Sequence, residues 1–227
     1  MFGSEREVIA IDCETHALVP PRPMTPWREG RFGLMTMLDP EGLSTLRLVQ
    51  VGWAKGDIAS AEPEVKTRMV KPEGFHINDQ ATAKHRISHA LAEASGVTIR
   101  TALVGLCTDV FEVCERGGRV AGHHLEFDAT LIAQELQLLG LREMLTEWEA
   151  CVRKGFCSMS PHIGQWIRRQ AAQAIPDAPQ RIPIKLSDAV FAMLPGGTKL
   201  LEEHHDAGRD ALMRWLLYQE LARRVAL

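Results

Sequence analysis

The sequence predicts a single mixed α/β domain in which a small sheet is flanked by helices. Its 227 residues suit one domain, and 45% of them are hydrophobic, which is enough for a sizeable core. Short β-branched runs come early in the chain, and segments with helical periodicity mostly follow them. We find neither internal repeats nor low-complexity tracts, so we expect one domain over residues 1–227.

The predicted strands begin at the N-terminus. The run EVIAID (7–12) is short and apolar, which is typical of a buried strand. Residues 18–42 are rich in Pro and Gly and predict a long loop inserted into the domain. Residues 44–54 and 64–72 predict two more strands, and the AKGD sequence indicates an antiparallel hairpin between them.

Helices dominate the rest of the predicted domain. Residues 79–96 and 99–118 favour helix, and the second segment ends on two glycines, a helix-stop signal. A short strand is expected at 119–124. Further helices are expected at 127–141, 161–174, 185–194 and from about Asp206 to the C-terminus. Residues 142–182 as a whole are expected to be a variable, largely helical region.

Charge and cysteine usage exclude several classes of protein. The net charge is −3, so any nucleic acid would be bound by a local site and not by a global positive field. The five cysteines form no CxxC pair, which argues against disulfide frameworks and cysteine zinc sites. We therefore expect free thiols in a reducing, cytoplasmic compartment. The sequence has neither a signal peptide nor a membrane-length apolar stretch, so no membrane partner is expected.

Two carboxylates lie at the end of the first predicted strand. Side chains alternate along a strand, so Asp12 and Glu14 face one side while Cys13 points into the core. Adjacent carboxylates raise each other's pKa unless a cation lies between them. The plain alternative is a polar strand end that faces water.

Asp128 follows the strand predicted at 119–124. Asp at a helix start is a common N-cap, which is the plain interpretation. The strand nevertheless brings Asp128, together with His123 and His124, to one end of the sheet.

The C-terminal helix carries a fourth carboxylate. Helical spacing places Ala207, Asp210, Ala211 and Arg214 on one face. The small residues of this face let the helix approach the sheet, which would bring Asp210 towards the first two carboxylates. Asp206 is interpreted as the N-cap, and His205 as a capping group or a mobile base, since histidine titrates near neutrality.

Three motifs in this order resemble the DEDDh, or DnaQ-like, 3′→5′ exonucleases of the RNase H-like superfamily. The matching segments are DCET (12–15), HLEFD (124–128) and HDAGRDA (205–211). Each motif is weak alone, but three in the right order and secondary structure are specific. The chain departs from the family pattern at His123-His124, where His-Asn is usual, and at His16-Ala17, where Thr-Gly is common.

The resemblance implies an RNase H-like mixed sheet of about five strands and a metal-dependent exonuclease. The substrate would be the 3′ end of single-stranded nucleic acid, with DNA favoured over RNA and nucleoside monophosphates released. Two Mg²⁺ or Mn²⁺ ions would be held by Asp12, Glu14, Asp128 and Asp210, because these cations prefer carboxylate oxygens. His205 would be the general base. Substrate contacts would come from Thr15, His16, His124 and Phe127, and a homodimer is a further expected partner.

Other parts of the chain suggest nucleic-acid contacts. The 18–42 insertion would lie at the mouth of the site. Its large apolar side chains would either stack on bases or, as favoured, pack the insertion onto the domain; they are Trp27, Phe32, Met35 and Met37. Phosphate contacts, or ordinary solvated surface, are expected of Lys84, His85, Arg86, Arg168, Arg169, Arg223 and Arg224. Arg168 and Arg169 are the pair to test first.

Two alternatives stay open. The HHD sequence at 204–206 resembles the signature of HD-type metal phosphohydrolases, but those proteins are all-helical, whereas the first carboxylate pair is on a predicted strand. The other alternative is a nuclease-like module that binds nucleic acid without turnover. The presence of all five expected site residues argues against that module.

Overall fold

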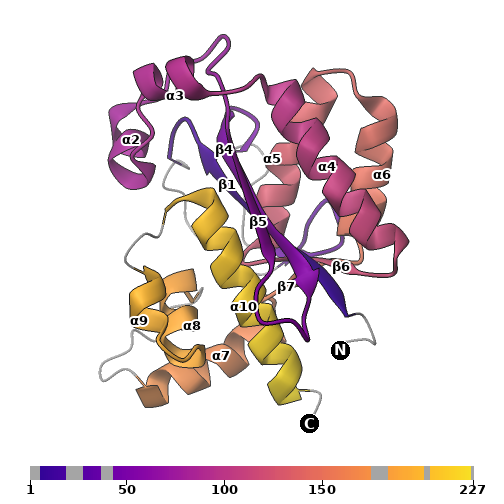
Figure 1. Ribbon diagram of the computed structural model, residues 1–227, viewed down its shortest axis with the longest axis vertical. Helices are drawn as coiled ribbons and strands as arrows, with labels where there is room; N and C mark the ends of the chain where they lie inside the picture. Colours follow the sequence, from indigo (N-terminus) through magenta and orange to yellow (C-terminus); the bar gives the residue numbers. More distant parts are fainter. Residues whose placement is uncertain (1–5, 19–27, 37–42, 175–183, 202–204, 226–227) are drawn as a thin grey trace.

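The computed structural model describes residues 6–18, 28–36, 43–174, 184–201 and 205–225. Its centre is a sheet of five strands: β1 (Glu7–Thr15), β4 (Leu48–Asp57), β5 (Glu64–Met69), β6 (Arg119–Gly122) and β7 (Phe156–Cys157). The strand order is β5-β4-β1-β6-β7 (Figure 1). Because β1 pairs antiparallel with β4 and parallel with β6, the sheet is mixed. The predicted α/β class and the number of strands are confirmed.

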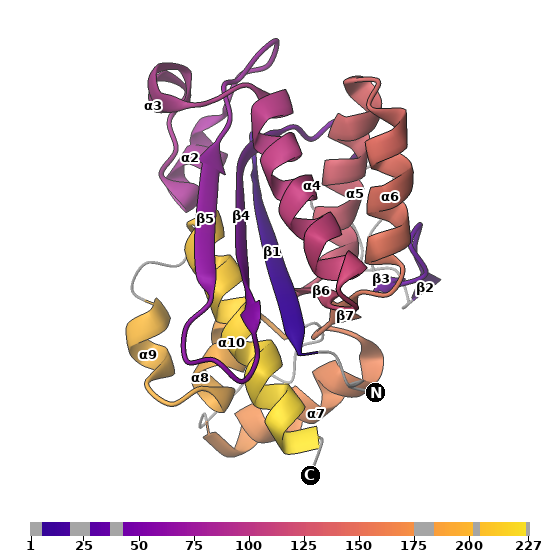
Figure 2. The ribbon, with the colours of Figure 1, turned by 45° about the vertical axis from the view of Figure 1, so that its right-hand side comes forward.

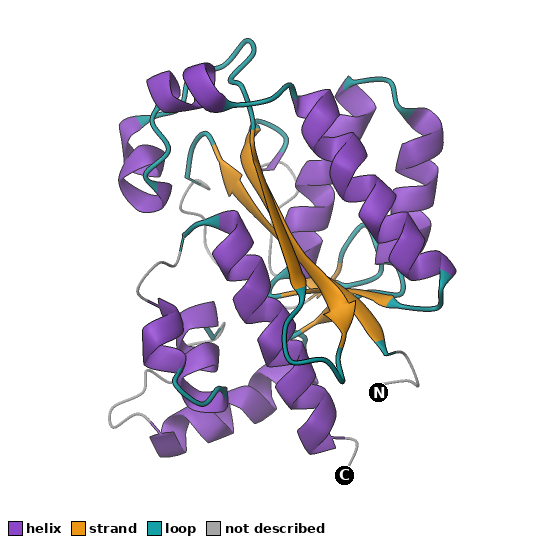
Figure 3. Ribbon diagram, in the orientation of Figure 1, coloured by secondary structure: helices purple, strands orange, loops and turns teal. Residues whose placement is uncertain are grey.

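Helices cover both faces of this sheet (Figure 3). One face is covered by α4 (Ile99–Glu115), α5 (Leu125–Leu138) and α6 (Arg142–Val152). The other face is covered by α10 (Ala207–Val225), with α7 (Pro161–Ala174), α8 (Leu186–Met193) and α9 (Gly197–Leu200) packed beside it (Figure 2). Two short helices, α2 (Asp79–His85) and α3 (His89–Ser95), lie between β5 and α4 in the chain.

Alternation along β1 assigns its residues to two separate cores. Ile9 and Ile11 belong to the larger core, which includes side chains of α4, α5 and α6. Val8 and Ala10 belong to a second core with Trp215 of α10. Even-numbered positions of β1 therefore face α10, and this face is the one that carries Asp12 and Glu14.

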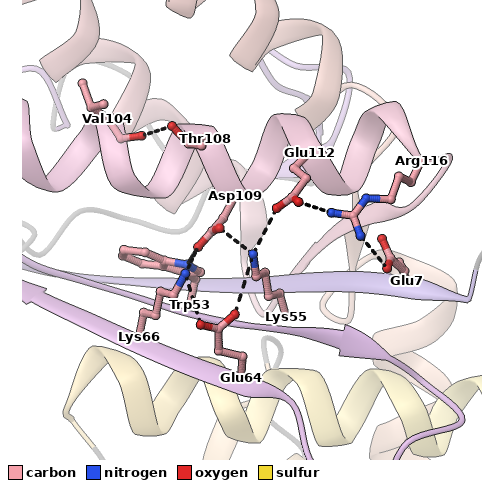
Figure 4. A network of polar contacts seen from close by, with 10 residues as sticks. All are labelled: Glu7, Trp53, Lys55, Glu64, Lys66, Val104, Thr108, Asp109, Glu112 and Arg116. Atoms are coloured by element: carbon pink, nitrogen blue, oxygen red, sulfur yellow. Dashed lines mark hydrogen bonds and ion pairs between the residues drawn. The ribbon is translucent and has the colours of Figure 1, made fainter.

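A network of charged side chains links α4 to strands β4 and β5 (Figure 4). The Asp109 carboxylate accepts hydrogen bonds from Trp53 Nε1 at 2.6 Å, Lys55 Nζ at 2.5 Å and Lys66 Nζ at 2.8 Å. Burial alone would raise the pKa of Asp109, but these bonds together hold it below its usual value. The network lies on the face opposite α10 and is structural.

Some element boundaries differ from those expected. The segment 79–96 forms two helices, because Arg86 adopts a left-handed conformation (φ 62°) and Ser88 caps a new helix at Leu91 N. The AKGD sequence lies inside β4, where its last residue, Asp57, pairs with Glu7. The turn of the hairpin comes after it. Helix α5 begins at Leu125, three residues before Asp128.

All five cysteines are free thiols, as predicted. Among the residues described, we find no helix with the length and apolar character needed to cross a membrane.

Candidate functional site

The first part of the site is the pair of carboxylates on β1. Asp12 and Glu14 are 4% and 8% exposed, on the face that α10 covers. Cys13 between them points into the larger core, as alternation predicts. The pair is therefore buried, and the alternative of a strand end facing water is wrong.

The start of α10 is fixed to the sheet by polar contacts. Asp206 Oδ1 accepts hydrogen bonds from Gly208 N at 3.0 Å and Arg209 N at 3.1 Å, so the predicted N-cap is confirmed. The side-chain amide of Gln50 on β4 donates to Asp206 Oδ2 at 3.0 Å and accepts from Ala207 N at 2.8 Å. These hydrogen bonds fix the position of the first turn of α10 next to Gln50 of β4.

Glycines allow α10 to lie close against the sheet. Gly52 pairs with Asp12 across β1 and β4. A methyl group on Gly52 would overlap the backbone of Ala207, and one on Gly208 would overlap the Thr67 hydroxyl. The close approach predicted from the small residues is therefore present, and it carries Asp210 to the carboxylates of β1.

Three side chains converge there and could hold a metal ion. Glu14, His205 and Asp210 each offer one ligand atom, and these atoms lie within 4.8 Å of one another. Asp210 Oδ1 also accepts a hydrogen bond from His205 N at 3.2 Å, where the backbone is left-handed (φ 71°). Burial raises the pKa of Glu14 to about 8, opposed by Lys84 and reinforced by Asp210. Such a site favours a cation.

Asp128 reaches the site from the first turn of α5. It is 1% exposed and is not the N-cap, because the helix begins at Leu125 and the capping position is His124 (φ 72°). The plain interpretation of Asp128 as a cap is therefore wrong. The strand before it does bring it to β1, as the sequence predicted.

Arg214 is the residue at this site to which the sequence assigned no role. It lies one turn after Asp210 on α10, and its guanidinium forms ion pairs with Asp12 Oδ1 and, at 2.6 Å, with Asp128 Oδ2. It also donates to Ile11 O at 2.5 Å. Burial would lower the pKa of Arg214, but the two aspartates raise it, so the group is a permanent cation. Its four-residue spacing from Asp210 was the available signal.

Asp12 lies between the carboxylates of Glu14 and Asp210 on one side and the guanidinium of Arg214 on the other. One carboxylate oxygen contacts Arg214, and the other, Oδ2, is buried without a hydrogen-bond partner among the described residues. Burial raises the pKa of Asp12; Arg214 lowers it, and Asp210 adds to the increase. An unsatisfied buried oxygen beside Glu14 and Asp210 fits a metal ligand. Asp128 Oδ1 is also buried without a hydrogen-bond partner in the described part of the chain, but Asp128 Oδ2 is bonded to Arg214, whose guanidinium lies between Asp12 and Asp128. The carboxylate cluster therefore fits a divalent cation.

A cavity of about 580 Å³ lies beside these groups. Residues that line it include Lys84, His124, Phe127, His205, Asp210 and Arg214. The rings of His124 and Phe127 stack with their centroids 6.0 Å apart. Burial lowers the pKa of His124 to about 4, so this ring is neutral at pH 7. The cavity has room for a nucleotide and presents both rings and charges to it.

Two of the four expected substrate residues, Thr15 and His16, are not among the residues that line this cavity. Thr15 Oγ1 donates to Ala17 O at 2.8 Å, and His16 Nδ1 accepts from Arg47 N at 3.1 Å. Neither residue is among those described as lining the cavity, nor are Arg168 and Arg169. Of the basic candidates, Lys84 has the contact with the cavity that the phosphate hypothesis requires.

The described part of the insertion, residues 28–36, packs away from this cavity. Its strands β2 (Arg28–Glu29) and β3 (Met35–Thr36) line a separate cavity of about 640 Å³ with α5. Phe32 is 1% exposed in the larger core, and Glu126 Oε1 accepts from Phe32 N at 3.4 Å. Phe32 thus packs the insertion onto the domain and does not stack on bases. Trp27, Met37 and the side chain of Met35 lie outside the described part.

Comparisons with known proteins give a fold and not a family. No protein-family model and no curated protein sequence matches the chain. The structure is similar to the zinc-ion-bound form of an E. coli exonuclease I complex with single-stranded DNA, with 13% identity and a TM-score of 0.61 over 97% of this chain and 41% of that one. For E. coli exonuclease I with a dT13 oligonucleotide, the identity is 14% and the TM-score 0.62 over 98% and 42% of the two chains. The chain thus shares the fold of these structures and spans about two fifths of their length.

Proposed function

We propose that this chain is a metal-dependent 3′→5′ exonuclease that releases nucleoside monophosphates from single-stranded DNA ends. The observation that carries the proposal is the convergence of Glu14, His205 and Asp210 beside a cavity of nucleotide size. The fold it shares with exonuclease I, which is seen bound to single-stranded DNA, supports the substrate class. The 3′→5′ polarity rests on the resemblance of the three sequence motifs.

The proposed hydrolysis would use a divalent cation held by carboxylates and a histidine general base. A bound divalent cation would lower the pKa of water and stabilise the leaving oxygen. Glu14 and Asp210, with the unsatisfied Oδ2 of Asp12, would hold it through hard oxygen ligands. His205 lies within the same 4.8 Å cluster, so it can accept the proton of the attacking water as general base.

The cavity residues would position the substrate. The stacked pair of His124 and Phe127 offers apolar ring faces to the terminal nucleotide. Lys84, which lines the same cavity, would pair with a backbone phosphate. RNA remains a second substrate class, because the same stacking and charge contacts suit both nucleic acids.

One alternative is supported by a specific observation. Arg214 forms ion pairs with both Asp12 and Asp128, and a module that binds nucleic acid without turnover would show the same ion pairs. The HD-type alternative does not fit, because Asp12 and Glu14 lie on a central strand of a five-stranded sheet.

A single gel tests the proposal. DNA and RNA oligonucleotides labelled at the 5′ end are incubated with Mg²⁺, Mn²⁺ or EDTA. We expect a ladder of shortened products with DNA, its loss in EDTA, and at least about a 100-fold loss of rate in Asp12→Asn and Asp210→Asn. Asp79→Asn, an exposed aspartate on α2, is the matched control and should cleave like the wild type.

The product pattern separates the alternatives. Release of the labelled mononucleotide at the earliest times would mean the opposite polarity. Retained binding of every oligonucleotide with no cleavage would favour the binding module.

A further inference from the structure

The cation between Asp12 and Asp128 belongs to the protein itself. We propose that Arg214 takes the place of one of the two divalent cations expected from the sequence motifs, so that the site binds a single metal ion. The inference deepens the proposed function, on which it rests, because it concerns how the same carboxylates are used.

The geometry of the ion pairs is the first support. Arg214 comes from α10, Asp12 from β1 and Asp128 from α5, so three elements converge on one guanidinium. By the resemblance of the sequence motifs, these two aspartates would be the protein ligands of the second ion. A planar guanidinium that bonds both of them, and Ile11 O as well, fills the space between them.

Burial makes this arrangement persistent. The Arg214 side chain is 10% exposed, and those of Asp12 and Asp128 are 5% and 1% exposed. Withdrawing the guanidinium would leave buried carboxylates without a counter-charge, which is strongly unfavourable. A divalent ion would have to displace Arg214 before it could use both aspartates.

The remaining donors suit one ion. Glu14 and Asp210 lie in one cluster with His205, and Asp12 Oδ2 has no hydrogen-bond partner among the residues that the structure describes. Asp12 would thus bridge a metal ion on one side and Arg214 on the other. The guanidinium would supply a fixed positive charge that a chelator cannot remove, and it lines the cavity where a phosphate would bind.

The test counts Mn²⁺ ions bound to the full chain, by calorimetric titration and by electron paramagnetic resonance of free Mn²⁺. We expect one ion per chain in the wild type, one in Arg214→Lys, and two in Arg214→Ala, where the aspartates are released. Arg209→Ala, an exposed arginine on the same helix, is the matched control with one ion.

A second variant keeps the test decisive if Arg214→Ala does not fold. Asp128→Asn should still bind one Mn²⁺ per chain, because Asp128 pairs with Arg214 and not with the metal. Asp210→Asn should lose the ion.

Several outcomes would overturn the proposal. Two ions in the wild type would show that Arg214 moves aside. One ion in folded Arg214→Ala, or loss of an ion in Asp128→Asn, would contradict it as well. Counting needs no turnover, so a wild type that binds one ion but cleaves nothing would defeat the proposed function and leave this inference standing.

Discussion

His123 illustrates how burial sets the charge of one side chain near the site. Its Nδ1 lies 2.8 Å from Ser158 Oγ and its Nε2 lies 2.9 Å from Ile184 O. Burial lowers the pKa of His123 to about 3, with Arg214 adding to the decrease, so the ring is neutral at pH 7. The neutral ring joins the end of β6 to the segment before α8, which forms one wall of the cavity.

This neutral histidine predicts a loss of stability in mild acid. Below about pH 6.5 the unfolded chain binds a proton at His123, whereas the folded chain does so only near pH 3. His123 should therefore lower the free energy of unfolding by about 2 kcal/mol between pH 7 and pH 5. The lowered pKa of His124 adds to this loss and the raised pKa of Glu14 opposes it, so the contribution of His123 is the part that a His123 variant removes. Urea unfolding at the two pH values measures the difference.

The comparison needs a variant without the titrating ring. His123→Asn should be less stable at pH 7 and should show a smaller loss between pH 7 and pH 5. His162→Asn, at an exposed position, is the control and should keep the wild-type difference. An unchanged pH dependence in His123→Asn would contradict the neutral, buried ring.

At the scale of residues, the sequence predicted the carboxylates but not their cation. Asp12 and Glu14 follow from strand alternation, and Asp210 follows from the small residues around it. Helical spacing even placed Arg214 on the correct face. Its partner Asp128 comes from α5, however, and such a pair depends on tertiary structure that no local pattern contains.

At the scale of elements, the contact between α10 and β4 determines the geometry of the site. Gly52→Ala would push the start of α10 away from the sheet, because the added methyl overlaps the Ala207 backbone. We expect a loss of about 1–3 kcal/mol in the free energy of unfolding. We also expect weaker Mn²⁺ binding, since Asp210 moves with the helix. Denaturant unfolding and metal titration measure the two effects.

A glycine on the opposite face provides the control. A methyl at Gly105 on α4 would lie 3.9 Å from the nearest atom of Trp53, an ordinary contact. Gly105→Ala should therefore stabilise the protein by about 0.5–1 kcal/mol and leave Mn²⁺ binding unchanged. Equal metal affinity in Gly52→Ala and the wild type would refute the role of the close contact.

Long periodic elements were predicted well, and their ends less well. The strand at 7–12, and the helices at 99–118 and 161–174, follow from hydrophobic periodicity and stop signals. The AKGD sequence was misread because pairing with β1 extends β4 through it. The break in 79–96 was missed because Arg86 carries a left-handed conformation that glycine or asparagine would have signalled.

At the scale of the whole molecule, metal binding should be visible as stability. A ligand that binds only the folded state at about 100 times its Kd adds about 2.7 kcal/mol. For a chain of this size, Mn²⁺ should raise the Tm by about 5–10 °C over the chelated protein. Thermal melts across a Mn²⁺ series measure the effect. Asp210→Asn should lose it, and a Tm that is the same in Mn²⁺ and in EDTA would count against the carboxylate cluster.

The fold as a whole was predictable, whereas the place of the insertion was not. Four strands were predicted from residue patterns, and the resemblance of three motifs in order gave the count of about five. The two-residue strand β7 was too short to be predicted from the residues. The position of residues 28–36 depends on contacts from distant elements, such as the 2.6 Å ion pair of Arg31 with Glu149. Ion pairs between residues far apart in the sequence produce no hydrophobic periodicity from which they could be predicted.

Helix α5 separates two cavities, and substitutions on its two faces can therefore accumulate independently during evolution. Glu126 faces the insertion and Asp128, two residues later, faces the site, and the two cavities share none of the residues described as lining them. Mutations that reshape the hairpin of residues 28–36 can therefore accumulate without disturbing the carboxylates. Lineages of this fold are expected to diversify first on the hairpin side of α5, where substitutions do not reach the carboxylate site.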